Sequence, residues 1–197
     1  YQDVAGCKEA CLNTAGRGGI IKKGETTNTI QLARERKTRL FLEARDIFMT
    51  DLITDIMKFV RYCEKKDKLP CLRLNGTSDI QWEHIKIDGQ NIFEMFPDVQ
   101  FYDYTKIPTR KVEQYKNYHL TWSYSEANSK YAQYFDAIKY NIAVVFHGTM
   151  PIYYKGREVI DGDKSDIRFK DKPNVVVGLK AKGKARHDSS GFVIHTA

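Results

Sequence analysis

Hydrophobic residues follow two different spacings along the chain. Over residues 29–63 they recur every three or four positions, which predicts a helix that Asn28 or Thr29 can cap. Further on they gather in short runs typical of strands, followed by an antiparallel hairpin at residues 152–163 around Lys155-Gly156. A short helical or irregular stretch is predicted over residues 81–96, and a helix over residues 127–140. The main predicted strands cover residues 71–75, 99–103, 119–122, 142–146 and 175–179.

Helices or long connectors separate these strands, which favours βαβ units and a parallel sheet. The continuous apolar runs at 142–146 and 175–179 suit strands that are covered on both faces. Too few strands are present for a closed eight-stranded barrel. We therefore expect an α/β fold that is either a partial TIM-like barrel or an open, mostly parallel sheet with helices outside.

Each predicted strand runs out into polar residues, and the first such cluster is Asn75-Gly76-Thr77-Ser78-Asp79. Gly76 has no Cβ, so the backbone there could approach a ligand closely. A turn whose side chains bond their own backbone is the more common explanation. Recurrence of polar groups at the other strand ends is what favours a ligand site. The candidate binding residues are Asn75, Thr77, Ser78, Asp79, Lys106, Ser123, Glu126, Lys180 and Lys182, and the candidate catalytic residues are Asp79, Glu126 and His147.

If the strands are parallel, their carboxyl ends share one edge of the sheet. We then expect Asn75, Ser123 and Lys180 to border a common cavity. Polar residues at the strand ends also have simpler explanations. Ser125 could cap a helix at residue 127, and residues 180–184 could form a solvated loop. His119 is interpreted as a local hydrogen bonder.

Composition narrows the class of protein. The 197 residues, 42% hydrophobic and 29% charged, fit a single domain over residues 1–197. A formal charge of +7 is compatible with an anionic ligand or nucleic acid, and also with an ordinary surface. No apolar run is long enough for a membrane span, and no secretory signal is visible. With only four cysteines, we expect a reducing, cytoplasmic setting and no membrane partner; the oligomeric state is left open.

Residues 1–29 form a Cys/Gly-rich loop region in which Cys7 and Cys11 are separated by three residues. Two thiolates are an incomplete set for an iron–sulfur cluster or a structural zinc. Elsewhere, the loop with Asp161, Asp163 and Asp166 could hold a divalent cation, although an Asp-rich turn is the more common explanation.

Several segments that span nearly the whole chain form a recognisable set: residues 7–18, 73–80, 102–106, 120–126, 159–163, 177–183 and 188–193. Together they resemble the gene product 88 domain of mycobacteriophages, other phages and bacteria. Because the chain begins at Tyr1 rather than Met, we expect it to be N-terminally incomplete. The resemblance implies a phage-type protein of the host cytoplasm, with a Cys-Pro, and so a third cysteine, upstream of the present start.

The order of a cysteine loop, a helix and a strand ending in a polar motif is similar to that of radical-SAM enzymes. By this analogy Cys7 and Cys11 would hold a four-iron four-sulfur cluster, and S-adenosylmethionine would bind at the strand ends. The motifs depart from that pattern: Asn13 or Thr14 stands where the third cysteine belongs, and no Gly-Gly-Glu is present. The alternative hypothesis is a non-catalytic nucleic-acid-binding accessory protein, suggested by the net charge and the basic residues between Arg34 and Arg39.

Overall fold

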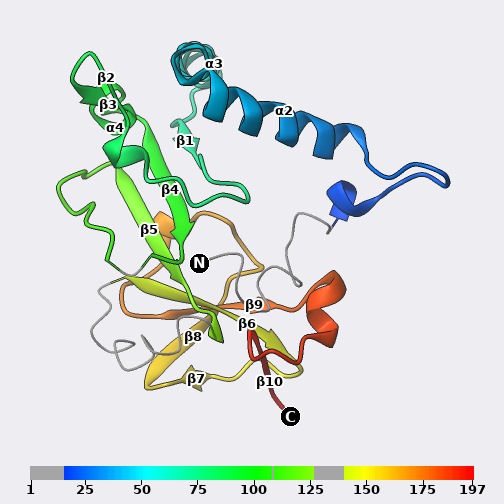
Figure 1. Cartoon of the computed structure of the whole chain (residues 1–197). Coiled ribbons are helices and arrows are strands. Elements are labelled where there is room, and N and C mark those ends of the chain that lie inside the picture. The colour runs from blue at the N-terminus through cyan, green and yellow to red at the C-terminus, as the bar shows by residue number, and fades with distance from the viewer. Residues whose placement is uncertain (1–15, 108, 127–139) are drawn as a thin grey trace.

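An open, mostly parallel sheet organises the residues that this computed structural model describes, namely 16–107, 109–126 and 140–197 (Figure 1). All neighbouring strands of this main sheet are parallel except β7 and β8, which form the predicted hairpin. The eight strands lie in the order β1-β4-β5-β6-β9-β8-β7, with β10 paired to β6. Their bounds are β1 Cys71–Leu72, β4 Gln100–Thr105, β5 Tyr118–Ser123, β6 Asn141–His147, β7 Tyr153–Tyr154, β8 Arg157–Asp161, β9 Val176–Lys180 and β10 Val193–His195.

The strand order confirms the open-sheet form of the α/β prediction. From β1 to β6 each new strand joins the outer edge of the previous one, as in a TIM barrel. The progression then stops, because β9 pairs directly with β6 and leaves β8 outside it. The described strands do not close into a barrel, and the partial-barrel form of the prediction stays an interpretation.

The single helix predicted over residues 29–63 is in fact two helices, α2 (Thr29–Glu43) and α3 (Arg45–Lys65). The chain leaves helical geometry at Ala44, where φ is −142° and ψ is 63°. This break allows the ring of Phe41 to lie 5.3 Å from that of Phe48 and 5.8 Å from that of Trp82. Neither Pro nor Gly marks the position, so the sequence pattern gave no sign of the break. Asn28 caps α2, as predicted, by accepting a hydrogen bond from the backbone N–H of Gln31.

Residues 81–96 hold more structure than the predicted short helical or irregular stretch. They contain the 3-10 helix η3 (Trp82–His84), strands β2 (Lys86–Ile87) and β3 (Gln90–Asn91), and helix α4 (Ile92–Met95). Asp88 and Gly89 both have positive φ, 48° and 83°, which is the geometry of a tight two-residue hairpin turn. The remaining 3-10 helices are η2 (Gly16–Gly19), η5 (Arg168–Lys170) and η6 (Gly183–His187). The helix predicted at 127–140 falls almost entirely outside the described residues.

The two faces of the sheet differ in character because side chains alternate along each strand. The helix face carries Phe101, Leu120 and Trp122, and its apolar residues pack with Met49 and Ile56 of α3. The other face is covered by η5, whose Phe169 ring lies 5.7 Å from that of Tyr102, and we call it the η5 face. Its residues on β4 and β5 and just beyond β4 are polar or polar aromatics: Tyr102, Tyr104, Lys106, His119, Thr121 and Ser123.

Candidate ligand-binding site

Three of the predicted site residues meet where β1, β4 and β5 end. The ammonium of Lys106 donates a hydrogen bond to Ser123 Oγ over 2.8 Å. The backbone N–H of Lys106 donates to Asp79 Oδ2 over 2.7 Å. The same ammonium lies 5.2 Å from the centre of the Phe192 ring. Loops that follow three neighbouring strands thus converge at one part of the carboxyl edge, with the C-terminal segment beside them.

Lys180 and Lys182 belong to a second polar group, at the ends of β8 and β9. Lys182 Nζ lies 2.6 Å from Asp163 Oδ1, and the backbone N–H of Lys180 donates to Asp163 Oδ2 over 2.9 Å. Partial burial acts to raise the pKa of Asp163, but the two hydrogen bonds and the lysine charges outweigh it and lower the pKa. In the strand order β6 separates this group from the Lys106 group.

The other predicted residues take separate places on the same edge. His147 ends β6 in an exposed position, with its ring 5.2 Å from that of His195. Glu126 accepts a hydrogen bond from Ser125 Oγ over 3.1 Å. Gly191 lies so near that a Cβ added there would be 3.4 Å from the Cβ of Glu126.

Asn75 is a buried residue that ties its own loop together. Its side-chain amide donates to the carbonyl of Ile80, and its oxygen accepts from Ser78 Oγ and Trp82 Nε1 over 2.9 and 3.2 Å. Thr77, two residues further on, is exposed. Asn75 and Ser78 therefore shape the loop from within, and Asp79 is its link to the strand next door.

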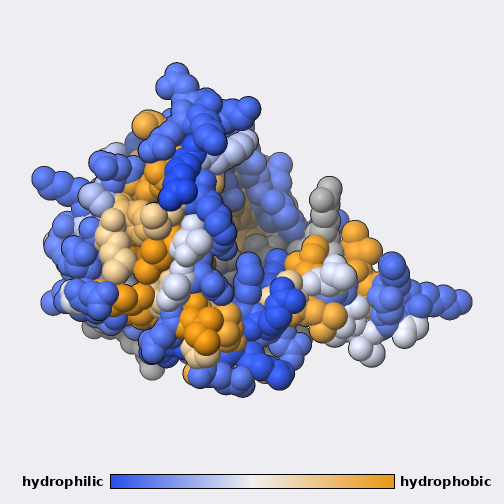
Figure 2. All heavy atoms as spheres, turned by 90° about the horizontal axis from the view of Figure 1, so that it is seen from above, coloured by the Kyte–Doolittle hydropathy of each residue, from blue (hydrophilic) through white to orange (hydrophobic). Residues whose placement is uncertain are grey.

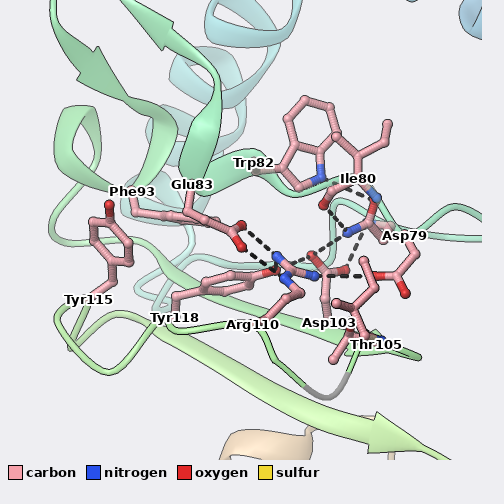
Figure 3. Close-up of polar contacts among 12 residues, drawn as sticks. Asp79, Ile80, Trp82, Glu83, Phe93, Asp103, Thr105, Arg110, Tyr115 and Tyr118 are labelled. Carbon is pink, nitrogen blue, oxygen red and sulfur yellow. Dashed lines mark hydrogen bonds and ion pairs between the residues drawn. The ribbon is translucent and has the colours of Figure 1, made fainter.

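Behind this loop, on the helix face, Arg110 is fully buried in an ion-pair network (Figure 3). Its Nε and one terminal nitrogen donate to the two carboxylate oxygens of Glu83 over 2.9 and 2.6 Å. The other terminal nitrogen donates to Asp79 Oδ1 over 3.2 Å, and Tyr118 Oη accepts a further bond. Desolvation acts to lower the pKa of Arg110, but the hydrogen bonds with Glu83 and the nearby negative charges raise it overall. Arg110 thus stays charged with all three nitrogens engaged.

Asp103 of β4 is the titratable centre of this network. It accepts hydrogen bonds from the backbone N–H of Asn75 over 2.8 Å and from Tyr118 Oη over 3.2 Å. Desolvation raises its pKa to about 6, against these hydrogen bonds and the charges of Arg73 and Arg110, which lower it. The sequence analysis did not single out Asp103, Glu83 or Arg110, because their roles depend on contacts between distant segments.

A second buried guanidinium, Arg168 of η5, lies on the opposite face of the sheet. Only 1% of the residue is exposed. One terminal nitrogen donates to the carbonyl of Ser165, and the other lies 3.4 Å from Asp171 Oδ2 in a loose ion pair. Among the described residues, Arg168 Nε and Nη1 have no hydrogen-bond acceptor.

Two polar atoms of β5 on the same face share this condition. His119 Nε2 and Thr121 Oγ1 are buried and form no hydrogen bond within the described part of the chain. Within the described ranges Nε2 of His119 has no hydrogen-bond partner, so the interpretation of His119 as a local hydrogen bonder is not supported at this atom. Burial, with a smaller contribution from the charge of Arg168, lowers the pKa of His119. The sequence does hold a sign of this group, because the polar residues His119, Thr121 and Ser123 alternate with apolar or aromatic ones along β5.

The described residues do not provide a metal site. No group of three or more His, Cys, Asp or Glu residues in ranges 16–107, 109–126 and 140–197 is placed to hold a metal ion. In the acidic loop the backbone N–H of Asp163 donates to Asp161 Oδ1 over 3.0 Å, as in a turn that an Asp side chain stabilises. Cys7 and Cys11 lie outside these ranges. Cys63 is buried near the end of α3, and Cys71 begins β1, at the end of that strand opposite to the carboxyl edge. Within the same ranges no helix is long and apolar enough to cross a membrane.

Comparison with known proteins identifies the family. The model of the family described as gene product 88 matches residues 2–196, nearly the full chain. Neither the curated proteins nor the solved structures contain a match. The family match covers every segment on which the resemblance was based. The chain belongs to the gene product 88 family.

Proposed function

We propose that this protein is an enzyme that binds a polar, anionic ligand at the carboxyl edge of the sheet, beside Lys106 and Ser123. The observation that carries the proposal is the placement of Lys106, which is only 8% exposed and lies between the ends of β4 and β5. Ligands of open α/β sheets bind at the carboxyl ends of the strands. A sheltered ammonium at such an edge is suited to a carboxylate or phosphate group.

Neighbouring groups give this edge the elements of a reactive site. Asp79 fixes the backbone of Lys106 and is itself held by Arg110, so it acts as a positioning residue. Glu126 and His147 are the proposed acid–base groups, since both follow strands that end at this edge. No reaction class is assigned to them.

A finer form of the proposal adds a four-iron four-sulfur cluster on Cys7, Cys11 and an upstream cysteine, with S-adenosylmethionine at the edge. It is supported by the order of the segments along the chain. Cys7 and Cys11 themselves lie outside the described residues. Anaerobic reconstitution of an N-terminally extended chain with iron and sulfide should give a brown protein with charge-transfer absorption. A colourless product would exclude this form and leave the ligand site at Lys106 untouched.

The ligand site itself is tested by calorimetric titration with adenosine monophosphate as an anionic, nucleotide-like probe. We expect Lys106→Met to weaken binding at least about tenfold, since one charge-assisted hydrogen bond contributes roughly 1.5–3 kcal/mol. Lys184→Met is the matched control, because Lys184 is exposed in η6. Equal binding by the two variants would overturn the role of Lys106.

A second candidate function, binding of nucleic acid, is favoured by helix α2. This helix has no buried residue and extends away from the sheet as an arm, which we define as residues 16–43 (Figure 1). Lys22, Lys23, Arg36 and Lys37 on the arm are all exposed. The space-filling view shows hydrophilic side chains at the tip of the arm (Figure 2).

Fluorescence anisotropy with labelled single- and double-stranded DNA and RNA tests this candidate. Binding through phosphates must weaken with salt, and each lost contact reduces the log–log slope by about 0.7–0.9. We expect the double variant Arg36→Gln/Lys37→Gln to lose about two phosphate contacts and to show a correspondingly shallower log–log slope. Lack of binding at low salt would exclude the candidate.

A further inference from the structure

Arg168 lies in the middle of the η5 face, between strands that are far apart in the sequence. Helix η5 lies against β5, and Phe169 packs on Tyr102 of β4. On the other side, a Cβ added to Gly162 would be 3.0 Å from Arg168 Nη1 and 2.5 Å from Val177 Cγ1. The guanidinium therefore reaches from β4 and β5 to the carboxyl ends of β8 and β9, and Gly162 leaves the space that it occupies.

This guanidinium is buried without a full set of acceptors. Arginine stays charged in proteins and carries five N–H donors, and a buried charge is normally paired and hydrogen bonded. The carbonyl of Ser165 takes one donor, and Asp171 is close enough for attraction but not for a hydrogen bond. Nε and Nη1 have no acceptor among the described residues. An oxyanion would supply the missing acceptors, beside the one negative charge that Asp171 already places near the guanidinium.

The neighbouring side chains offer further donors, and the guanidinium of Arg73 lies 4.6 Å from the centre of the Tyr104 ring. Strand register pairs Tyr102 with His119 and Tyr104 with Thr121, so these residues form two successive rungs on the η5 face. Thr121 Oγ1 and His119 Nε2 have no partner within the described ranges. The pKa of His119 is lowered by burial and by the charge of Arg168, so the ring is neutral and can donate one N–H.

We propose that Arg168, His119 and Thr121 bind a compact oxyanion, a carboxylate or a phosphate group, on the η5 face. Lys106 and Ser123 form the next rung of the same face, toward the carboxyl edge. A ligand that enters at this edge can extend along the rungs and place its oxyanion against Arg168. The inference rests on the proposed function for the rest of that ligand, whereas the oxyanion site itself can be measured alone.

The test uses the full chain with inorganic phosphate and, separately, acetate, each titrated at constant ionic strength against sodium chloride. Binding is followed by calorimetry and by the shift in the melting temperature. We expect one of the two anions to bind and to stabilise the protein, and Arg168→Met to weaken that binding at least about tenfold. Lys170→Met is the matched control, since Lys170 is exposed in the same 3-10 helix. Preference for acetate indicates a carboxylate ligand, and preference for phosphate indicates a phosphorylated one.

Thr121→Val keeps the shape of the side chain and is the second variant if Arg168→Met fails to fold. It should weaken binding of the preferred anion several-fold while Lys170→Met leaves it unchanged. Two results would overturn the inference: neither anion acting more strongly than chloride, or equal responses from Arg168→Met and Lys170→Met. If anion binding instead depends on Lys106 and not on Arg168, the proposed function stands and this site does not.

Discussion

Each face of the sheet buries an arginine, and the two guanidinium groups differ in how many hydrogen-bond partners they have. Arg110, on the helix face, gives every nitrogen an acceptor from Glu83, Asp79 or Tyr118 (Figure 3). Arg168, on the η5 face, has one close hydrogen bond and a loose ion pair. Burial of the side chain is nearly the same, so the difference lies in the partners alone.

A complete set of partners is the mark of a structural role. Arg110 joins the loop after β1 to the segment before β5, and removing it would leave two carboxylates facing an apolar interior. An incomplete set of hydrogen-bond partners destabilises the fold, because a buried polar group loses its hydrogen bonds to water and gains none within the protein. Such a group persists where another molecule supplies the partner. We therefore interpret Arg110 as a structural centre on one face of these strands and Arg168 as a binding centre on the other.

The largest expected effect is the loss of Arg110. Breaking a buried ion pair by removing one partner destabilises a protein by about 3–5 kcal/mol, since the remaining charge is uncompensated. We expect Arg110→Met to reduce the free energy of unfolding by this amount. Without ligand, Arg168→Met should change it by no more than about 1 kcal/mol, because replacing a poorly paired buried charge by a hydrophobic side chain is often neutral. Urea unfolding measures both.

If the two substitutions had similar effects in ligand-free protein, the contrast between the centres would be lost. Arg168 would then be as structural as Arg110.

The next effect is a pH dependence that originates at Asp103. Its pKa is about 6 in the folded protein, above that of an exposed aspartate, so the folded state binds the proton more tightly than the unfolded state. Stability should therefore fall as the pH rises from about 4 to 6 and then stay level with respect to this group, with a total change of about 3 kcal/mol.

Urea unfolding of the protein and of Asp103→Asn across this pH range isolates the contribution. The difference between the two curves should have the stated slope. If the difference in unfolding free energy does not change with pH, Asp103 keeps an ordinary pKa. The Arg110 network would then be more open to solvent than its contacts indicate.

Gly162 tests the space around Arg168 at smaller magnitude. A Cβ there would lie 2.5 Å from Val177 Cγ1 and 3.0 Å from Arg168 Nη1, which is closer than side chains approach. Overpacking of this kind costs about 1–3 kcal/mol, so Gly162→Ala should lower the midpoint of urea unfolding. Gly76→Ala is the control, since a Cβ at Gly76 has open space around it. Equal stability of the two variants would show that the space between Gly162, Val177 and Arg168 is not tightly filled.

The sequence predicted the sheet better than it predicted the site. Runs such as 142–146 and 175–179 fix a parallel strand by composition alone, and β6 and β9 lie there within a residue or two. Lys155-Gly156 likewise marks the β7–β8 turn, where both residues have positive φ. Asp88-Gly89 carries the same turn signal and was missed, because its flanking strands are only two residues long.

The site depends on contacts that no local pattern encodes. Lys106 and Ser123 could be anticipated as residues at strand ends, and they do meet. Arg168 lies in a stretch without periodicity, so neither its burial nor its place against β5 could be read from its neighbours. Glu83 and Arg110 are separated by 27 residues and joined only through the fold. The spatial order of the strands in the sheet decides which charges become buried together, and the local sequence pattern does not give that order.

The smallest expected effect belongs to the exposed pair of Lys182 and Asp163, which provides a scale for the two buried centres. Its charged atoms are 2.6 Å apart, closer than the 3.4 Å between Arg168 and Asp171, yet the lysine side chain is 58% exposed. Solvent screens such a pair, and holding a long side chain in place offsets part of the attraction, so Lys182→Met should cost about 0.2–1 kcal/mol. Because the pair lowers the pKa of Asp163, the loss should be present above the ordinary range of a carboxyl group and disappear as the pH falls through the pKa of Asp163. Added salt should reduce it further. A loss above about 2 kcal/mol that persists in high salt would show that short distance, rather than burial with a full set of partners, governs the strength of ion pairs in this sheet.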